Sequence, residues 1–264
     1  DTPTAINVTH TRLAAAGTTT ITVSGMNFGD AEAFVDVRIG GTSCQTTTFL
    51  SFSEVQCLTA AGVDIDHTLT VQVEDQTGTL GFPLSYVAPV VLNVTRKSGS
   101  ATGGNILPVL GKHFGAFDSS TKAQLGATAT ASSVWTSDSI MSCKTAQGVD
   151  NDRGLGITVA LQSGSFSNAF SYFRAHIQSV PSNIPSSGGR IEVIGGSSFS
   201  ASDTSVRARM GLTACEHTAW FADSHVTCQS AQARMQDDLV IATVASQLST
   251  KLHAVTHDFV SVSS

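Results

Sequence analysis

Two matched pairs of cysteines are the residues of this 264-residue chain whose type and spacing point most directly to a chemistry. Cys44 and Cys57 are 13 positions apart, and so are Cys215 and Cys228. Two thiols at one spacing, used twice, fit a disulfide that closes a short loop, which stabilises by roughly 3 kcal/mol in the chain-entropy model. Paired cysteines in small domains indicate an oxidising, extracellular setting.

The second pair also permits a metal site. Cys215 and Cys228 have His217 and His225 beside them, and zinc prefers such ligands. The first pair has no histidine near it, so the cysteines at these positions do not require a metal. The comparison of the two cysteine pairs favours a disulfide in each of them, and neither a metal nor any other cofactor is predicted.

A fifth cysteine, Cys143, stands midway between the two pairs, and Thr130 occupies the place of its partner. An odd cysteine in a secreted chain indicates either an intermolecular bond or a buried thiol. We favour the buried thiol, because threonine opposite it fits a cysteine that is simply part of the core.

Pairs of carboxylates separated by one residue occur at Asp64 and Asp66 and again at Asp150 and Asp152, while a third copy keeps only Asp237 in register. Such pairs would bind Ca²⁺ if six or more oxygens were gathered, and few are visible here. Aspartate is also an ordinary turn former. We favour the turn interpretation.

Two sequons, Asn7-Val8-Thr9 and Asn93-Val94-Thr95, lie 86 positions apart. On an extracellular chain they predict N-glycans on Asn7 and Asn93. The third copy has Ser179-Val180-Pro181 there and lacks the signal. Thr18–Thr20 and Thr46–Thr48 are compositional candidates for O-linked sugars.

An aromatic residue stands eight positions before each of three cysteines, as Phe49, Trp135 and Trp220. These rings would serve either as platforms for sugar or as packing residues of a small sandwich, and we favour packing. No Ser/His/Asp set, pair of catalytic carboxylates or phosphate-binding loop is kept between copies. The chain is therefore predicted not to be an enzyme.

The composition of the chain narrows the possible classes of function further. Charged residues make up 13% of the chain and the formal net charge is −6. No basic run is present, so nucleic-acid binding is not predicted. No apolar run approaches the ~20 residues of a membrane helix, so membrane insertion is not predicted either.

These features are carried by an internal repeat, since cysteines recur at 57, 143 and 228, a period of 86 and then 85 residues. A repeat of this kind indicates a tandem architecture. Apolar and polar residues alternate at period two, as in short antiparallel strands. Such runs are residues 18–23, 34–39, 69–73, 156–161 and 239–244.

Three segments of the first copy carry a resemblance to a known family: Ile21–Phe28 (ITVSGMNF), Val37–Cys44 (VRIGGTSC) and the following Cys57. The closing segment is clearest in the second copy, at Gly164–Tyr172 (GSFSNAFSY). These residues resemble the IPT/TIG family, the immunoglobulin-like domain of plexins and certain transcription factors. Departures are the missing first cysteine of the second copy and the irregular end at His257–Ser261.

The resemblance implies an all-β fold of three tandem immunoglobulin-like (IPT/TIG-type) β-sandwich domains, at 1–88, 89–175 and 176–264. Short joints predict a rod. Sparse charge leaves strand edges poorly protected against pairing. We therefore predict a non-catalytic structural subunit of an extracellular, glycosylated fibril or cell-surface assembly, with copies of itself as partners. The alternative is an adhesion or receptor ectodomain that binds a heterologous protein or glycan.

Overall fold

A computed structural model describes residues 1–232 and 239–257 of the chain. Within these ranges every helix or strand assigned is a β-strand. Each copy of the repeat has its own sheets. The Cα positions cluster into two compact units, and their boundary passes through the second copy: Asp1–Thr95, Leu107–Cys143 and Leu155–Phe166 in the first, and Arg96–Ile106, Lys144–Gly154 and Ser167–Ser264 in the second.

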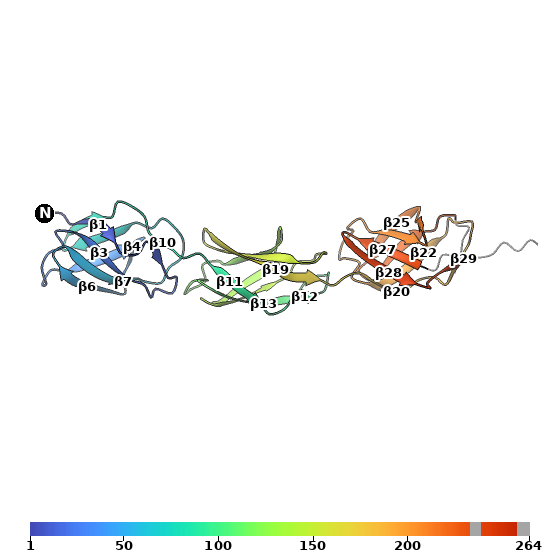
Figure 1. Ribbon diagram of the computed structural model, residues 1–264, viewed down its shortest axis with the longest axis horizontal. Coiled ribbons are helices and arrows are strands. Elements are labelled where there is room, and N and C mark those ends of the chain that lie inside the picture. Colours follow the sequence, from blue (N-terminus) through green and yellow to red (C-terminus); the bar gives the residue numbers. More distant parts are fainter. Residues whose placement is uncertain (233–238, 258–264) are drawn as a thin grey trace, which may run out of the picture. The chain divides into compact units, whose positions relative to one another are not determined.

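The first copy has two four-stranded antiparallel sheets, ordered β1-β3-β7-β6 and β5-β4-β8-β9. A short parallel pair, β2 with β10, closes the copy. Figure 1 shows β3, β7 and β6 running side by side. The strands are β1 (Thr4–Val8), β2 (Arg12–Leu13), β3 (Thr20–Met26), β4 (Val35–Ile39), β5 (Thr42–Ser43), β6 (Thr46–Ser51), β7 (Glu54–Leu58), β8 (Leu69–Val73), β9 (Gln76–Thr79) and β10 (Ser85–Tyr86).

The second copy repeats this plan as β11-β13-β17-β16 and a five-stranded sheet, β12-β19-β18-β14-β15. The parallel pair is here β12 with β19, a long strand that enters the second sheet. The strands are β11 (Val90–Val94), β12 (Ser98–Gly99), β13 (Ile106–Lys112), β14 (Lys122–Leu125), β15 (Thr128–Ala129), β16 (Ser132–Ser137), β17 (Ile140–Lys144), β18 (Arg153–Val159) and β19 (Gln162–Tyr172).

The third copy has the sheets β20-β22-β26-β25 and β24-β23-β27-β28, with β21 and β29 as its parallel pair. The strands are β20 (His176–Ser179), β21 (Asn183–Ile184), β22 (Ile191–Ser197), β23 (Arg207–Met210), β24 (Thr213–Ala214), β25 (His217–Ala222), β26 (His225–Gln229), β27 (Leu239–Val244), β28 (Gln247–Leu252) and β29 (Thr256–His257).

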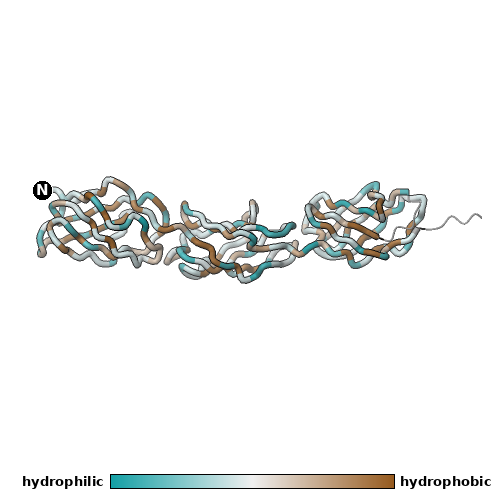
Figure 2. Tube along the Cα trace, in the orientation of Figure 1, coloured by the Kyte–Doolittle hydropathy of each residue, from teal (hydrophilic) through white to brown (hydrophobic). Residues whose placement is uncertain are grey.

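Alternation along the strands builds the core of each copy. In β3, Ile21 and Val23 are fully buried while Thr20 is exposed. Val37 and Val71 of the opposite sheet join the same hydrophobic cluster, so the two sheets pack face to face. Figure 2 shows apolar positions recurring along the strands of every copy. The predicted all-β, immunoglobulin-like sandwich fold is confirmed, whereas the domain boundaries and the rod remain predictions.

A glycine and a phenylalanine three residues later form the centre of each core. Phe28, Phe114 and Phe199 are each fully buried. A Cβ atom on Gly25 would lie 2.4 Å from the ring of Phe28 and 2.0 Å from a carbonyl oxygen of β1. On Gly111 it would lie 2.2 Å from the Phe114 ring. The repeated G-x-x-F motif therefore exists because ring and first strand leave no room for a side chain.

Candidate functional site

The two predicted disulfides are formed. Cys44 is bonded to Cys57 with a Cα–Cα distance of 5.8 Å, and Cys215 is bonded to Cys228 at 5.6 Å. In each case a half-exposed cysteine just after a short edge strand is tied to a buried cysteine in the middle of the opposite sheet. The bond therefore holds the two sheets of its copy together.

Geometry also favours the disulfide over the zinc alternative. His225 precedes Cys228 by three positions on β26, and an odd spacing places two side chains on opposite faces of a strand. His225 instead stacks on Phe221, with ring centroids 4.6 Å apart, and its Nδ1 lies 3.0 Å from Ser224 Oγ. Among the described residues no group of three or more His, Cys, Asp or Glu side chains is placed to hold a metal.

Cys143 lies in the core of the second copy with 2% of its surface exposed, and it forms no disulfide. Thr130 keeps the local contact of the missing cysteine, because its N–H and its hydroxyl both donate to the carbonyl of Ala123 at 3.0 Å. This burial agrees with the buried-thiol alternative. It also raises the pKa of the Cys143 thiol to about 11.

We expect a thiol reagent at about pH 8 to leave Cys143 unlabelled in the folded chain and to label it after unfolding. Because the unfolded thiol ionises at its ordinary pKa of 9.0, Cys143 costs no stability below that pH. The free energy of unfolding should fall as pH rises from about 9 to about 11, and it should fall less in Cys143→Ala, where Tyr86 and Tyr172, whose pKa values are also raised by burial, still contribute. Rapid labelling of the native chain would contradict the assignment.

The paired aspartates lie in loops between strands, with left-handed backbone conformations. Asp64, Asp66, Asp150 and Asp152 all have positive φ values, of 91°, 59°, 89° and 54°. Aspartate tolerates this region better than most residues, through local hydrogen bonds. The N–H groups of Asp66 and Asp152 each donate to a serine hydroxyl, at 3.1 and 2.9 Å. The turn interpretation accounts for these residues, and Asp237 lies outside the described residues.

The three repeated aromatic side chains are half-buried, and their contacts fit the packing interpretation. Phe49 and Trp220 pack against the buried clusters of their copies. Trp135 Nε1 donates to the carbonyl of Gly115 and Trp220 Nε1 to that of Ser200, both at 3.2 Å. Each indole is therefore anchored to the loop that follows the buried phenylalanine.

Both sequon asparagines are exposed, and each lies on the first strand of its copy at a β-bulge. The register of β1 with β3 skips Ile6, and that of β11 with β13 skips Leu92. Asn7 and Asn93 are thus exposed on edge strands, where a glycan has room. N-glycosylation of these residues remains a prediction.

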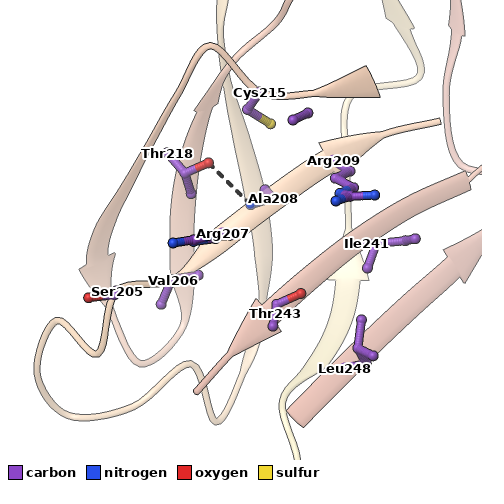
Figure 3. A pocket seen from close by; sticks show the side chains of 11 residues that line it. Ser205, Val206, Arg207, Ala208, Arg209, Cys215, Thr218, Ile241, Thr243 and Leu248 are labelled. Atoms are coloured by element: carbon purple, nitrogen blue, oxygen red, sulfur yellow. Dashed lines mark hydrogen bonds between the residues drawn. The ribbon is translucent and has the colours of Figure 1, made fainter. Parts of the chain in front are cut away.

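Sequence analysis did not identify a groove on the third copy, which we call the β23 groove. It has a volume of about 760 Å³. Its floor is formed by Arg207 and Arg209 on β23, by Ile241 and Thr243 on β27, and by Leu248 on β28 (Figure 3). The register places Arg207 opposite Thr243, and Thr243 opposite Leu248. Arginine side chains and apolar side chains therefore share one outer sheet face.

Both arginines of the groove are exposed, and neither forms a salt bridge with any described residue. Leu248 is 66% exposed. The backbone N–H of Ala208, beyond the segment of β23 that pairs with β24, donates to Thr218 Oγ1 at 3.1 Å (Figure 3). The guanidinium groups of Arg207 and Arg209 have no carboxylate partner among the described residues, and the Leu248 side chain is left largely exposed.

The same positions of the other copies are built differently. In the first copy they are Asp36 and Arg38, which pair with each other at 2.7 Å. In the second copy they are Lys122 and Gln124. Two neighbouring guanidinium groups, with no carboxylate partner in residues 1–232 and 239–257, thus distinguish the third copy.

The apolar part of the groove is distinctive too. Leu248 occupies the place of Thr77 in the first copy and Ser163 in the second. Ile241 likewise stands where the other copies have threonine and glycine. Alignment of the three copies against each other would have revealed this change, because the repeat keeps its core while these outward positions switch in chemical type.

Face-to-face antiparallel sheets with an inter-sheet disulfide define an immunoglobulin-like domain class. Within this class, the model of the IPT/TIG domain matches residues 3–86, 89–172 and 176–255. The chain belongs to the IPT/TIG domain family. In the part of the chain that the structure describes, no helix is long and apolar enough to cross a membrane.

Solved structures with similar folds share little sequence with this chain. One, a crystal structure with a xylogluco-oligosaccharide, is 12% identical, with a TM-score of 0.47 over 95% of this chain and 59% of the other. A surface glycan-binding protein from Prevotella bryantii is 12% identical (TM-score 0.44; 84% and 56%). The plexin A4 extracellular region is 13% identical (TM-score 0.34; 98% and 34%). The chain spans less than two thirds of each of these structures.

Proposed function

We propose that this chain is part of the extracellular region of an adhesion or receptor protein, where it binds a heterologous protein or glycan and catalyses no reaction. The β23 groove carries the proposal. A sheet face with only a structural role would resemble the equivalent positions of the first two copies, where Asp36 pairs with Arg38 and where Gln124 takes the place of Arg209. Exposed apolar side chains beside cations that have no ion-pair partner in the described part of the chain favour a surface that another molecule covers.

The extracellular setting is supported by the two disulfides, since such bonds persist in oxidising compartments. The use of IPT/TIG domains in receptor and adhesion ectodomains agrees with it. The absence of a catalytic role is supported by the repeat itself, because no reactive constellation recurs from copy to copy.

Binding is tested with the purified, glycosylated chain immobilised against arrays of extracellular proteins and of glycans, while sedimentation velocity measures its self-association. We expect a monomer that captures a heterologous ligand. Failure to bind any arrayed molecule, together with an ordered polymer of the chain, would overturn the proposal.

Glycans on Asn7 and Asn93 belong to the same proposal, and their mass can be measured. Expressed through a secretory pathway, the chain should lose mass on glycosidase treatment, and Asn7→Gln and Asn93→Gln should each remove one glycan. Asn168→Gln is the matched control, because Asn168 is exposed but starts no sequon. A chain whose mass is unaffected by glycosidase would refute this prediction.

Self-assembly into an extracellular fibril is a second candidate, favoured by the sheet edges. The edge strands β6 (TTTFLS), β16 (SSVWTS) and β25 (HTAWFA) contain no lysine, arginine, aspartate or glutamate. Charged residues are a common device that blocks edge-to-edge pairing. Added strands need mainly main-chain hydrogen bonds, so identical chains would pair with little demand on side chains.

Electron microscopy of the native material and of the concentrated chain tests this second candidate. Filaments formed by the unmodified chain should become rarer in a Thr48→Lys, Val134→Lys double variant, because both residues are exposed on the edge strands. A chain that remains monomeric at high concentration would rule the fibril out.

A further inference from the structure

We propose that the β23 groove binds an acidic, partly apolar polypeptide segment of a partner protein. The inference rests on the proposed function and specifies the ligand of the same site. It starts from the two guanidinium groups of Arg207 and Arg209, which lie on one face of β23 about 7 Å apart along the strand.

Carboxylates are the groups that these arginines are suited to bind. A guanidinium presents its donors in a planar fork that matches a carboxylate with two parallel hydrogen bonds. In the first copy the equivalent arginine, Arg38, already has such a partner in Asp36, at 2.7 Å. Arg207 stands in the place of that aspartate, so among the described residues the third copy has two cations without an internal carboxylate partner, which a ligand can neutralise.

The apolar side of the groove selects a polypeptide over an acidic glycan. Ile241 and Leu248 lie on the next two strands, about 5 and 10 Å from the arginines. The residues that line the groove include no aromatic ring on which a sugar would stack. A polyuronate supplies carboxylates but little apolar surface to cover Leu248, whereas a peptide supplies both from one face.

The test uses the full chain and a fluorescent twelve-residue peptide with the repeat Glu-Ser-Leu-Ser, whose extended form alternates Glu and Leu on one face. Fluorescence anisotropy should show saturable binding that weakens as salt is raised. Three further ligands define the chemistry: a peptide in which serine replaces every leucine, a peptide in which lysine replaces every glutamate, and polygalacturonate. We expect each of them to bind at least about tenfold more weakly, since one desolvated contact of this kind is worth about a factor of ten.

Variants locate the site. Arg207→Asp reproduces the ion pair of the first copy, so the fold accommodates it, and it should weaken binding of the Glu/Leu peptide by at least about tenfold. Leu248→Ser installs the residue of the second copy and should weaken the same peptide several-fold. Arg38→Gln changes the arginine of the first copy that is equivalent to Arg209, and it should have no effect. Circular dichroism checks that each variant is folded.

Three results would overturn the inference: equal affinity for the charge-only peptide, tighter binding of polygalacturonate than of the Glu/Leu peptide, or an Arg207→Asp variant that binds normally. The proposed function would still stand after any of these three results if the arrays identified another heterologous ligand. Conversely, a chain without any arrayed ligand that forms polymers would defeat the proposed function whatever the peptide does.

Discussion

Replacing Phe114 with alanine is expected to lower the free energy of unfolding of the second copy by about 3–5 kcal/mol, the usual cost of truncating a buried phenylalanine. The ring is fully buried. Its Cζ lies 2.2 Å from the place where a Cβ on Gly111 would stand. Gly111 has no side chain that could fill the space left by the ring, so we expect the cavity in the variant to remain largely open.

Trp135 reports this loss, since its indole donates to the carbonyl of Gly115, the residue next to Phe114. In a Trp220→Phe background, denaturant unfolding followed by tryptophan fluorescence would isolate the second copy. Lys112→Ala is the matched control, because Lys112 is exposed at the end of β13, two residues before Phe114, and its effect should stay within about 0.5 kcal/mol. A loss below about 1 kcal/mol for Phe114→Ala would show that the ring is not central to the core.

Removing the disulfide of the third copy, as Cys215→Ala with Cys228→Ala, is expected to lower its free energy of unfolding by roughly 3 kcal/mol. The bond closes a loop with a sequence separation of 13 and links the two sheets of its copy. Trp220 fluorescence in a Trp135→Phe background gives the measurement. The same transition under reducing conditions should show an equal loss in the unmodified chain and no further loss in the variant.

The second copy supplies the matched controls for this bond. Cys215→Thr copies the arrangement of Thr130 and Cys143, and its hydroxyl can donate as Thr130 does, so it should be about 1 kcal/mol more stable than Cys215→Ala. Conversely, Thr130→Cys should form a bond with Cys143 and stabilise the second copy by about 2–3 kcal/mol. A free thiol pair in that variant, seen by non-reducing peptide mapping, would show that its backbone does not allow the bond.

The three copies therefore share a common core and differ in how they are locked and in what they present outward. The first and third are held by disulfides, while the second relies on packing around a buried thiol. The third has in addition lost the internal ion pair that neutralises the equivalent arginine of the first. Stability therefore depends on the shared core together with disulfides that two of the copies have, whereas the proposed binding groove belongs to the third copy.

Much of the fold was predictable from the sequence because its signals are local and are repeated three times. Alternation at residues 69–73 and 239–244 marks β8 and β27, since a half-buried strand needs a period of two. The equal spacing of Cys44–Cys57 and Cys215–Cys228 identified the disulfides without any knowledge of strand register. The G-x-x-F motif recurs because each core needs the same ring against the same bare backbone.

Other properties depend on contacts between residues far apart in the chain, and only the tertiary structure decided them. Arg207 and Leu248 belong to one surface because both lie opposite Thr243 in the register of the β23-β27-β28 sheet. Strand geometry likewise places His225 and Cys228 on opposite faces, which argues against a zinc site shared by these two residues. The sequence by itself determined that the chain forms three β-sandwiches and that two of them carry a disulfide at the repeated positions. Strand register determined which side chains gather at the groove, and the packing of the second copy determined that the Cys143 thiol is buried.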